Sequence, residues 1–230
     1  GSHMRSTYHE LMEMIPQQVE QGERQPEGYY PVKLTMDDAE IHGRYYAVEQ
    51  AQQAAIWVGG VGGDWDSPAQ ELYPLLCQEL TKEGIASLRL RYRQPTDLEA
   101  SVIDVLAGLR YLQDQGIKTI ALIGHSFGGA VVIQAAAQSL AVRTVVTIAT
   151  QSYGTKEVPE LATQCSLLLL HGTNDSVLPF HCSQQVYDLA LDPKQLILYP
   201  DAGHNLDEVA DEVYATVRDW LLEQLNRELY

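Results

Sequence analysis

Apolar residues recur along the chain with two different periods, and the two periods alternate. Short and nearly continuous apolar runs are typical of strands that are covered on both sheet faces. Apolar residues spaced three or four positions apart are typical of helices. The clearest helical stretch is 97–116, where apolar residues from Leu98 to Leu112 share one face and Gly116 marks the end.

Eight runs are predicted as strands: residues 31–36, 43–48, 54–58, 85–92, 118–124, 143–150, 166–172 and 195–200. The first two flank a polar, turn-like segment and predict an antiparallel hairpin. Predicted helices alternate with the later strands, at 68–83, 97–116, 127–140, 178–191 and from about 206 onward. A hairpin followed by alternating strands and helices predicts an α/β fold with a mostly parallel sheet.

Two of the predicted helices carry cap signals at their starts. Ser67, Pro68 and Gln70 predict the N-cap, the first helical position and a capping box for the first helix. Asn205 and Glu208 predict a second box ahead of the last helix. Both helices are therefore expected to begin with local side-chain caps.

The chain divides into three unequal parts. Residues 1–4, GSHM, are typical of an expression-tag remnant. Residues 5–28 are mostly polar and predict an N-terminal arm, with one or two helical turns around residues 11–15. Residues 29–230 contain every predicted strand and no linker or repeat, so they predict a single domain with an ample core.

Composition limits the classes of function. The formal net charge of −16 argues against nucleic acid and against anionic membrane surfaces as partners. Cys77, Cys165 and Cys182 have no metal-ligand spacing and fit a reducing cytosol better than a disulfide framework. No apolar run reaches membrane-spanning length, and the start after the tag does not resemble a secretory signal. We therefore expect a cytoplasmic protein without a membrane span, a metal or another cofactor.

The segment GHSFG lies between the predicted strand 118–124 and the predicted helix 127–140. A G-x-S-x-G pattern between a strand and a helix is the signature of a nucleophile elbow. Small residues on either side permit a tight turn that exposes the serine hydroxyl at the start of the helix. The alternative is an ordinary tight turn whose serine only caps the helix. We interpret Ser126 as a nucleophile.

Two further polar residues follow successive strand ends. Asp175 comes after the strand 166–172, and His204 comes after the strand 195–200. Because the carboxyl ends of parallel strands share one edge of a sheet, both side chains are expected near Ser126. The chain order serine, aspartate, histidine is the order of the elbow arrangement. The pattern therefore predicts a Ser-His-Asp triad.

Other histidines and aspartates compete for these roles. His171, at a strand end, is interpreted as a buried structural histidine, and the His125 side chain is expected to point away from the cleft. Asp201 and Asp207 lie so close in sequence to His204 that a side-on contact with its ring is awkward. Asp175 therefore remains the preferred acid.

A glycine-rich loop, VGGVGG, follows the predicted strand 54–58. It lacks the Gly-Lys-Ser/Thr ending of a phosphate loop and the G-x-G-x-x-G spacing of a dinucleotide site. Asp64 and Asp66, directly after it, would also repel phosphate. We interpret the loop as backbone that comes close to a reacting carbonyl.

Together, the segments VGGVGG, GHSFGG, HGTNDSVLP and PDAGHNL resemble the α/β-hydrolase superfamily over about residues 29–225. The acid segment and the compact size are most similar to small dienelactone-hydrolase-like and serine-peptidase-like esterases. The resemblance implies an α/β-hydrolase fold with an eight-stranded, mostly parallel sheet. The chain departs from dienelactone hydrolases proper in one respect, because they use a cysteine nucleophile where this chain has Ser126.

The resemblance also implies an oxyanion hole and an open cleft. Relatives often carry His-Gly where this chain has Gly59 and Gly60, and by that match the backbone amides of Val61 and Phe127 would hold the oxyanion. Many relatives insert a large cap after the sixth strand, but only about fifteen residues stand there in this chain. An open cleft of this kind argues against strict selection of long lipids.

Four residues are candidates for substrate contact: Gly60, Trp65, Arg93 and Tyr153. Trp65 either forms a pocket wall or belongs to the core. Arg93 ends a period-two arginine series on the fourth strand and could bind a substrate carboxylate. The preferred interpretation is that these arginines pair with the acidic surface.

The sequence predicts a serine hydrolase that cleaves a small ester-type acyl substrate through an acyl-enzyme intermediate. Thioesterase or peptidase activity with the same triad, and acyl transfer to another alcohol or a peroxide, remain open alternatives. A non-catalytic binding protein on the same fold is a third. The only partner predicted is a small-molecule substrate.

Overall fold

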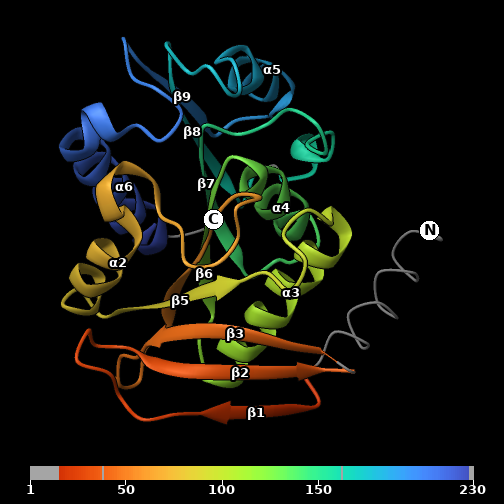
Figure 1. Cartoon of the computed structure of the whole chain (residues 1–230), viewed down its shortest axis with the longest axis vertical. Coiled ribbons are helices and arrows are strands. Elements are labelled where there is room, and N and C mark those ends of the chain that lie inside the picture. Colours follow the sequence, from red (N-terminus) through yellow and green to blue (C-terminus); the bar gives the residue numbers. More distant parts are fainter. Residues whose placement is uncertain (1–15, 38, 162, 228–230) are drawn as a thin grey trace.

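The computed structural model describes residues 16–37, 39–161 and 163–227. These residues form one sheet in the order β1-β2-β3-β5-β4-β6-β7-β8-β9, with helices on both faces (Figure 1). The first strands pair antiparallel, and the pairs from β5–β4 to β8–β9 are all parallel. The α/β architecture with a mostly parallel sheet is therefore confirmed.

The strands are β1 (Gln18–Gln21), β2 (Tyr30–Met36), β3 (Ala39–Tyr46), β4 (Gln53–Val58), β5 (Ile85–Arg91), β6 (Thr119–His125), β7 (Val142–Ile148), β8 (Ser166–Gly172) and β9 (Lys194–Tyr199). The α-helices are α2 (Pro68–Thr81), α3 (Leu98–Asp114), α4 (Phe127–Ala136), α5 (His181–Leu189) and α6 (Ala210–Asn226). Two short 3-10 turns are η1 (Val158–Leu161) and η2 (Asp207–Val209).

The sheet has one strand more than the sequence predicts. The additional strand is β1, which lies within the segment interpreted as a polar arm and pairs with β2 at the edge of the sheet. All four of its residues are exposed, so it carries no alternating apolar pattern. Backbone hydrogen bonds and a 3.0 Å ion pair between Glu20 and Lys33 join it to its neighbour. The tag remnant and the helical turns expected around residues 11–15 lie outside the described residues.

Two apolar layers, one on each face of the sheet, explain the continuous apolar runs of the strands. On β4, Ile56 faces the layer formed with α3 and α4, and the next residue, Trp57, faces the layer formed with α2 and α6. Each fully buried side chain of this kind stabilises the fold by roughly 1.5–3 kcal/mol. Successive residues of one strand therefore serve opposite layers, and the helices of each layer lie on opposite sides of the sheet in Figure 1.

The capping box predicted for the first helix is not formed. The backbone of Ala69, Gln70 and Glu71 is left-handed, with φ between 51° and 66°, although Pro68 begins the element as expected. The Ser67 hydroxyl accepts a hydrogen bond from the amide of Tyr73 at 2.8 Å. Gln70 turns away from the helix, because its amide and its side chain both bind another loop of the protein.

The box predicted for the last helix is also absent. The 3-10 turn η2 precedes α6, and the residue before η2 is Leu206, not Asn205. The Glu208 side chain accepts a hydrogen bond from the amide of Gly203 at 2.9 Å instead of capping the helix. Gln70 therefore binds another loop, whereas Ser67 and Glu208 make local hydrogen bonds other than the predicted caps.

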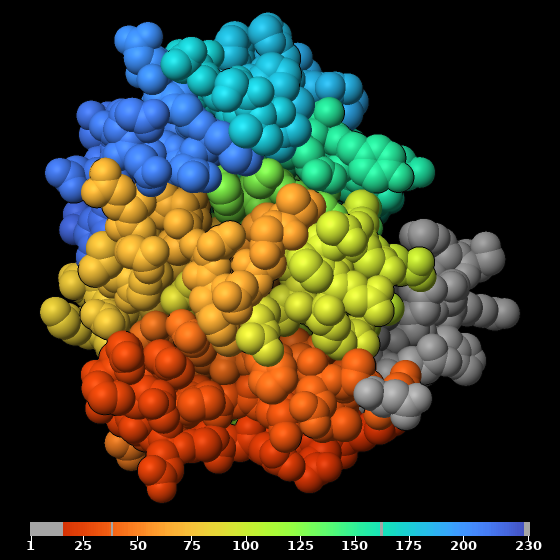
Figure 2. Space-filling model, in the orientation of Figure 1, coloured from red at the N-terminus to blue at the C-terminus, as the bar shows by residue number. Residues whose placement is uncertain are grey.

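The connection between β7 and β8 is short. In its described part, residues 149–161 and 163–165, the only regular element is η1, so the expectation of a fold without a large cap is confirmed. In Figure 2, green atoms near the middle of the chain remain visible between the orange, blue and cyan segments. Within the described ranges, no helix combines the length and apolar character needed to cross a bilayer.

Candidate active site

Ser126 lies at the turn between β6 and α4, where the backbone is strained. Its φ of 59° and ψ of −118° belong to a region that costs a non-glycine residue of order 1–3 kcal/mol. A Cβ atom on Gly124 would overlap the carbonyl oxygen of Gly128, and one on Gly128 would lie 2.5 Å from the carbonyl oxygen of Gly59. The two glycines of the G-x-S-x-G segment are therefore required by close backbone packing, as the elbow interpretation expects.

The structure brings together the three residues that the sequence selects. The Nε2 atom of His204 lies 3.1 Å from the Ser126 hydroxyl, and its Nδ1 atom lies 2.7 Å from Oδ2 of Asp175. The Asp175 side chain is fully buried, whereas the His204 side chain is 18% exposed. This is the arrangement in which a histidine can accept a proton from a serine while a carboxylate orients its ring.

The buried carboxylate of Asp175 is held in its ionised form. Its Oδ1 atom accepts hydrogen bonds from the amides of Val177 and Leu178, at 2.9 and 2.8 Å. Burial by itself raises the pKa of Asp175, but the hydrogen bonds from His204 and from these two amides outweigh it and lower that pKa below its ordinary value. A negative charge therefore stands behind the His204 ring at neutral pH.

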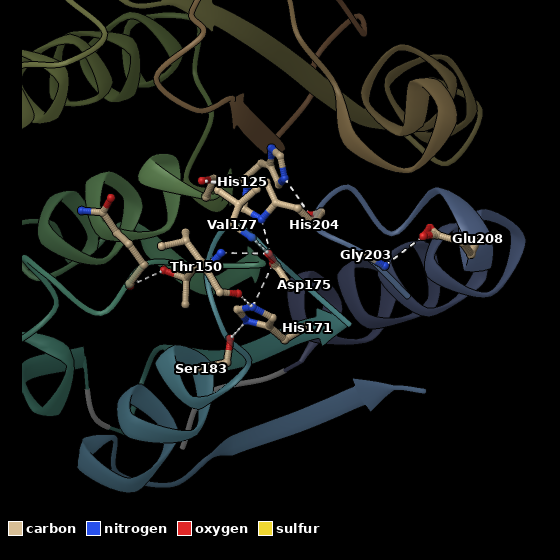
Figure 3. A network of polar contacts seen from close by, with 12 residues as sticks. His125, Thr150, His171, Asp175, Val177, Ser183, Gly203, His204 and Glu208 are labelled. Carbon is tan, nitrogen blue, oxygen red and sulfur yellow. Dashed lines mark hydrogen bonds and ion pairs between the residues drawn. The ribbon is translucent and has the colours of Figure 1, made fainter. Parts of the chain in front are cut away.

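His171 is a buried, hydrogen-bonded histidine, as predicted, but it also touches the acid. Its Nε2 atom lies 2.8 Å from the Leu178 carbonyl oxygen and 3.1 Å from Oδ2 of Asp175 (Figure 3). A carbonyl oxygen only accepts, so Nε2 carries the proton and Nδ1 accepts from the Ser183 hydroxyl at 2.6 Å. Burial lowers the pKa of His171, which favours this neutral ring. The sequence shows the histidine four positions before the aspartate, but not the turn that joins them.

His125, the neighbour of Ser126, packs against the candidate base. Its ring centroid lies 5.0 Å from that of His204, and its Nε2 atom lies 3.2 Å from the His204 carbonyl oxygen. Burial is the main cause that lowers the pKa of His125 to about 4, so the ring is neutral at pH 7. A neutral Nε2–H donates to the His204 carbonyl and supports the loop that carries the base.

The glycine loop comes close to the candidate nucleophile. A Cβ atom on Gly60 would lie 3.4 Å from the Cβ atom of Ser126 and 3.8 Å from its hydroxyl oxygen. The loop turns back through a hydrogen bond from the amide of Gly63 to the Gly60 carbonyl, and the Tyr92 hydroxyl donates to the carbonyl oxygen of Gly59 at 2.8 Å. Val61, directly after Gly60, is therefore positioned at the edge of the site.

Phe127 is the first residue of α4, and its amide belongs to the first helical turn. Amides of a first turn have no acceptor within their own helix. The amides of Phe127 and Val61 thus flank Ser126 from the helix and from the glycine loop. Their joint role as an oxyanion hole stays a prediction.

Trp65 is neither an apolar core residue nor a bare pocket wall. The guanidinium of Arg44 lies 4.1 Å from the centre of its ring, and those of Arg89 and Arg91 each lie 5.8 Å away. The Arg89 side chain also donates to the Trp65 carbonyl oxygen at 2.6 Å. Cation–π contacts of this kind anchor the segment after the glycine loop to β3 and β5.

Arg93 is already engaged by a residue inside the protein. Its backbone amide and its guanidinium Nε both donate to the Asp104 carboxylate, whose side chain is fully buried. The expectation that the arginine series pairs with the acidic surface holds only for Arg91, which lies 3.5 Å from the exposed Asp64. For Arg93 that expectation is wrong, because the buried carboxylate of Asp104 requires a cation.

Tyr153 lies on the connection between β7 and β8. Its side chain is 79% exposed. Two residues earlier, the amide of Gln151 donates to the Ser126 carbonyl oxygen at 3.4 Å, and the Gln151 side chain donates to the Tyr153 carbonyl oxygen. The β7–β8 connection thus carries an exposed aromatic ring to the margin of the site.

The sheet, the elbow and the short connection above them define an α/β serine hydrolase without a lid. XC6422 from Xanthomonas campestris, described as such a hydrolase, aligns with a TM-score of 0.72 and 18% identity over 90% of this chain and 100% of its own. A dienelactone hydrolase from Anabaena variabilis aligns with a TM-score of 0.74 and 18% identity over 86% of this chain and 98% of its own. At such identities these likenesses support the fold alone.

The family follows from the sequence itself. The model of the dienelactone hydrolase family matches residues 78–221, so the chain belongs to this family. The uncharacterized protein YfhR of Escherichia coli K12 is 31% identical over 144 residues, which are 51% of this chain and 50% of that protein. The chain thus spans about half the length of the curated relatives it matches.

Proposed function

We propose that this protein is a serine esterase that hydrolyses a small ester through Ser126, His204 and Asp175. The observation that supports it most strongly is the continuous contact from the Ser126 hydroxyl through the two ring nitrogens of His204 to the ionised, buried Asp175. An ordinary helix-capping serine has no need of such a chain of contacts. The strained backbone of Ser126 adds to this, since strain of this kind accumulates at functional sites.

In the first step, His204 Nε2 takes the proton of the Ser126 hydroxyl as its oxygen attacks the ester carbonyl carbon. Asp175 keeps the other ring nitrogen protonated and stabilises the imidazolium that forms. The amides of Val61 and Phe127 donate to the developing oxyanion, and each such donor is worth about 3 kcal/mol in the transition state. His204 then returns the proton to the leaving alkoxide, and the alcohol departs.

In the second step, water replaces the alcohol. His204 removes a proton from the water as its oxygen attacks the acyl carbon, and it then gives that proton to the Ser126 oxygen as the carboxylic acid leaves. No further cofactor takes part in this sequence. The open margin of the site leaves room for water to reach the acyl-enzyme.

Names of similar proteins favour an ester over other acyl compounds. One solved neighbour is the esterase domain of a Rhodothermus marinus protein, and another, Est1E from Butyrivibrio proteoclasticus, has been solved with ferulic acid bound. These names belong to those proteins. They guide the choice of substrates for this chain, in which thioesters and amides serve as the alternatives.

Labelling with a fluorophosphonate probe tests the proposal most directly. We expect stoichiometric modification of Ser126, hydrolysis of p-nitrophenyl acetate, and loss of both in Ser126→Ala. Ser139→Ala, three residues beyond the end of α4, is the matched control and should retain both. If well-folded protein is neither labelled nor active on esters, thioesters or amides, the function is binding without catalysis.

A further inference from the structure

Three large apolar side chains stand exposed around the triad. Val61 is 55% exposed, Tyr153 is 79% exposed and Val177 is 65% exposed. They come from three different connections, after β4, β7 and β8. We call these three residues the apolar rim.

Each rim residue is tied to the triad by a short path. Val61 follows Gly60, which lies against Ser126. The amide of Val177 donates to Asp175, and Figure 3 shows Val177 beside His204. Tyr153 follows the segment whose amide binds the carbonyl oxygen of Ser126. The three rim residues therefore lie on three different connections, each of which contacts a residue of the candidate triad.

The rim is not explained by the stability of the fold. Single exposed apolar residues are common and require no explanation, and Leu140, which is 86% exposed near the end of α4, is one of them. Three such residues that gather around one candidate site are different, since exposed apolar groups that cluster mark surfaces for binding. The tyrosine ring adds a rigid aromatic face at low cost in entropy.

Exposed acidic side chains outnumber basic ones in the loops around the site. Asp66 follows the glycine loop, and Asp201, Asp207 and Glu208 surround His204 in the sequence, all of them exposed. Arg91, the last residue of β5, pairs with Asp64, and Arg93, two residues later, pairs with the buried Asp104, so neither pair adds a net charge. Arg44 and Arg89 lie against the ring of Trp65. With a formal net charge of −16 on the chain, a substrate carboxylate meets a repulsive field at this edge of the sheet.

We propose that the site selects neutral esters that carry an apolar group, which lies against the rim, and that it disfavours esters with a second, charged carboxylate. This inference rests on the esterase function proposed above and specifies its substrate class. The same charges favour turnover, because the acid released by hydrolysis is an anion and is repelled from the site, while the neutral ester is not.

Four p-nitrophenyl esters with one leaving group test the apolar part of the proposal: the acetate, butyrate, hexanoate and benzoate. We expect kcat/KM to rise at least about tenfold from acetate to the better of hexanoate and benzoate. Tyr153→Ala and Val177→Ala should each lower that ratio roughly three- to tenfold, whereas Leu140→Ala, the matched control, should not change it. A flat series, or a ratio that neither rim variant changes, overturns the proposal.

Mono-p-nitrophenyl succinate, compared with the butyrate ester, tests the charge part. We expect its kcat/KM to be at least about tenfold lower at low ionic strength, with a gap that narrows in 0.5 M salt because screening shortens the range of the field. A preference for the succinate ester contradicts the proposal. If the acetate is hydrolysed without the expected preferences, the substrate class is wrong and the esterase function stands. If Ser126 is not labelled and no ester is cleaved, the esterase function and the proposed substrate class are both wrong.

Discussion

The loop that carries Asp175 and the loop that carries His204 serve one contact but are held in different ways. The acid loop is closed by hydrogen bonds among near neighbours. The Asp175 carboxylate accepts from the amides of Val177 and Leu178. The Nε2 atom of His171 contacts the Leu178 carbonyl oxygen and the Asp175 carboxylate. All of these residues lie within eight positions of one another, so the candidate acid is oriented by local contacts.

The histidine loop is held by a distant part of the chain near the surface. The amide of Ala69 donates to the Asn205 carbonyl oxygen at 2.7 Å. The amide of Gln70 donates to the Asp207 carboxylate at 2.9 Å, and the Gln70 side chain donates to the Asp207 carbonyl oxygen at 3.1 Å. The two partners of the last contacts are 137 positions apart in the sequence. We call this pairing of residues 69–70 with 205–207 the α2 joint.

This difference shows that the histidine loop, unlike the acid loop, is held by contacts with α2. The α2 joint keeps three consecutive non-glycine residues left-handed, at a cost of roughly 1–2 kcal/mol each. Five residues, 64–68, separate the joint from the glycine loop that lies against Ser126. The loop of the candidate base is therefore held by α2 and also by the acid loop, because the Asn174 amide donates to the Ala202 carbonyl oxygen and the Asp201 amide donates to the Thr173 hydroxyl.

The largest expected effect lies in the acid loop. Asp175→Asn removes the charge behind His204 and exchanges an acceptor for a donor, so the ring loses its required tautomer. We expect kcat for ester hydrolysis to fall about 10⁴-fold with little change in KM, a loss of the size found for such a substitution in other triads. Asp219→Asn, on the exposed face of α6, is the control. A loss of less than tenfold would assign the acid role to another residue, such as Asp201 or Asp207.

The pH dependence of stability should reveal the contribution of His125, whose ring supports the loop that carries His204. The folded-state pKa of His125 is about 4, below its ordinary 6.5, chiefly because the ring is buried. As the pH falls from 6.5 to 4, the unfolded chain therefore takes up a proton that the folded chain does not. This lowers the free energy of unfolding by roughly 3 kcal/mol across that window.

Urea titrations of wild type and His125→Gln at pH 7, 6, 5 and 4 measure this contribution. The variant should lose less stability than wild type over the window, and His42→Gln, on the exposed hairpin, should follow wild type. If the free energy of unfolding falls equally with pH in His125→Gln and wild type, the His125 ring is not held neutral in the folded protein. His171 contributes in the same direction in both proteins and cancels in the comparison.

A smaller effect is expected for His171→Phe, which removes the donor beneath the acid. The substitution leaves the Leu178 carbonyl and the Ser183 hydroxyl without their buried partner. We expect a loss of about 2–3 kcal/mol in the free energy of unfolding by urea titration, together with a lower kcat. Ser183→Ala removes one donor alone and should cost about 1 kcal/mol. If His171→Phe changed kcat but not stability, the acid loop would not be held locally.

The same comparison shows what the sequence could reveal. The sequence can select Ser126, Asp175 and His204 as the candidate triad because the constraints on them are local: small residues around a tight turn, and polar residues just after strand ends. The α2 joint was missed for the opposite reason. Gln70 has the spacing of a capping-box residue, and only the folded chain shows that it binds Asp207 in another loop instead.

Two further features escaped the sequence for physical reasons. The strand β1 has only exposed side chains, so no apolar pattern marks it. The partner of Arg93 is Asp104, an acid directly before Val105 on the apolar face of α3. A carboxylate beside an apolar helix face is a usable signal, because its burial requires a cation.

The smallest expected effect concerns the α2 joint itself. Asp207 is exposed, so Asp207→Ala should change the unfolding free energy by only about 0.5–1 kcal/mol, whereas the loosened loop should lower kcat roughly three- to tenfold with KM nearly unchanged. Asp207→Asn keeps an oxygen that accepts from the Gln70 amide and should restore most of kcat. Asp211→Ala, exposed in the first turn of α6, controls for loss of charge. If Asp207→Ala and Asp207→Asn behave alike, the carboxylate acts by charge and not by joining the loops. If kcat is unchanged in both variants, His204 is positioned by His125 and the elbow alone. The α2 joint then contributes nothing to the position of His204.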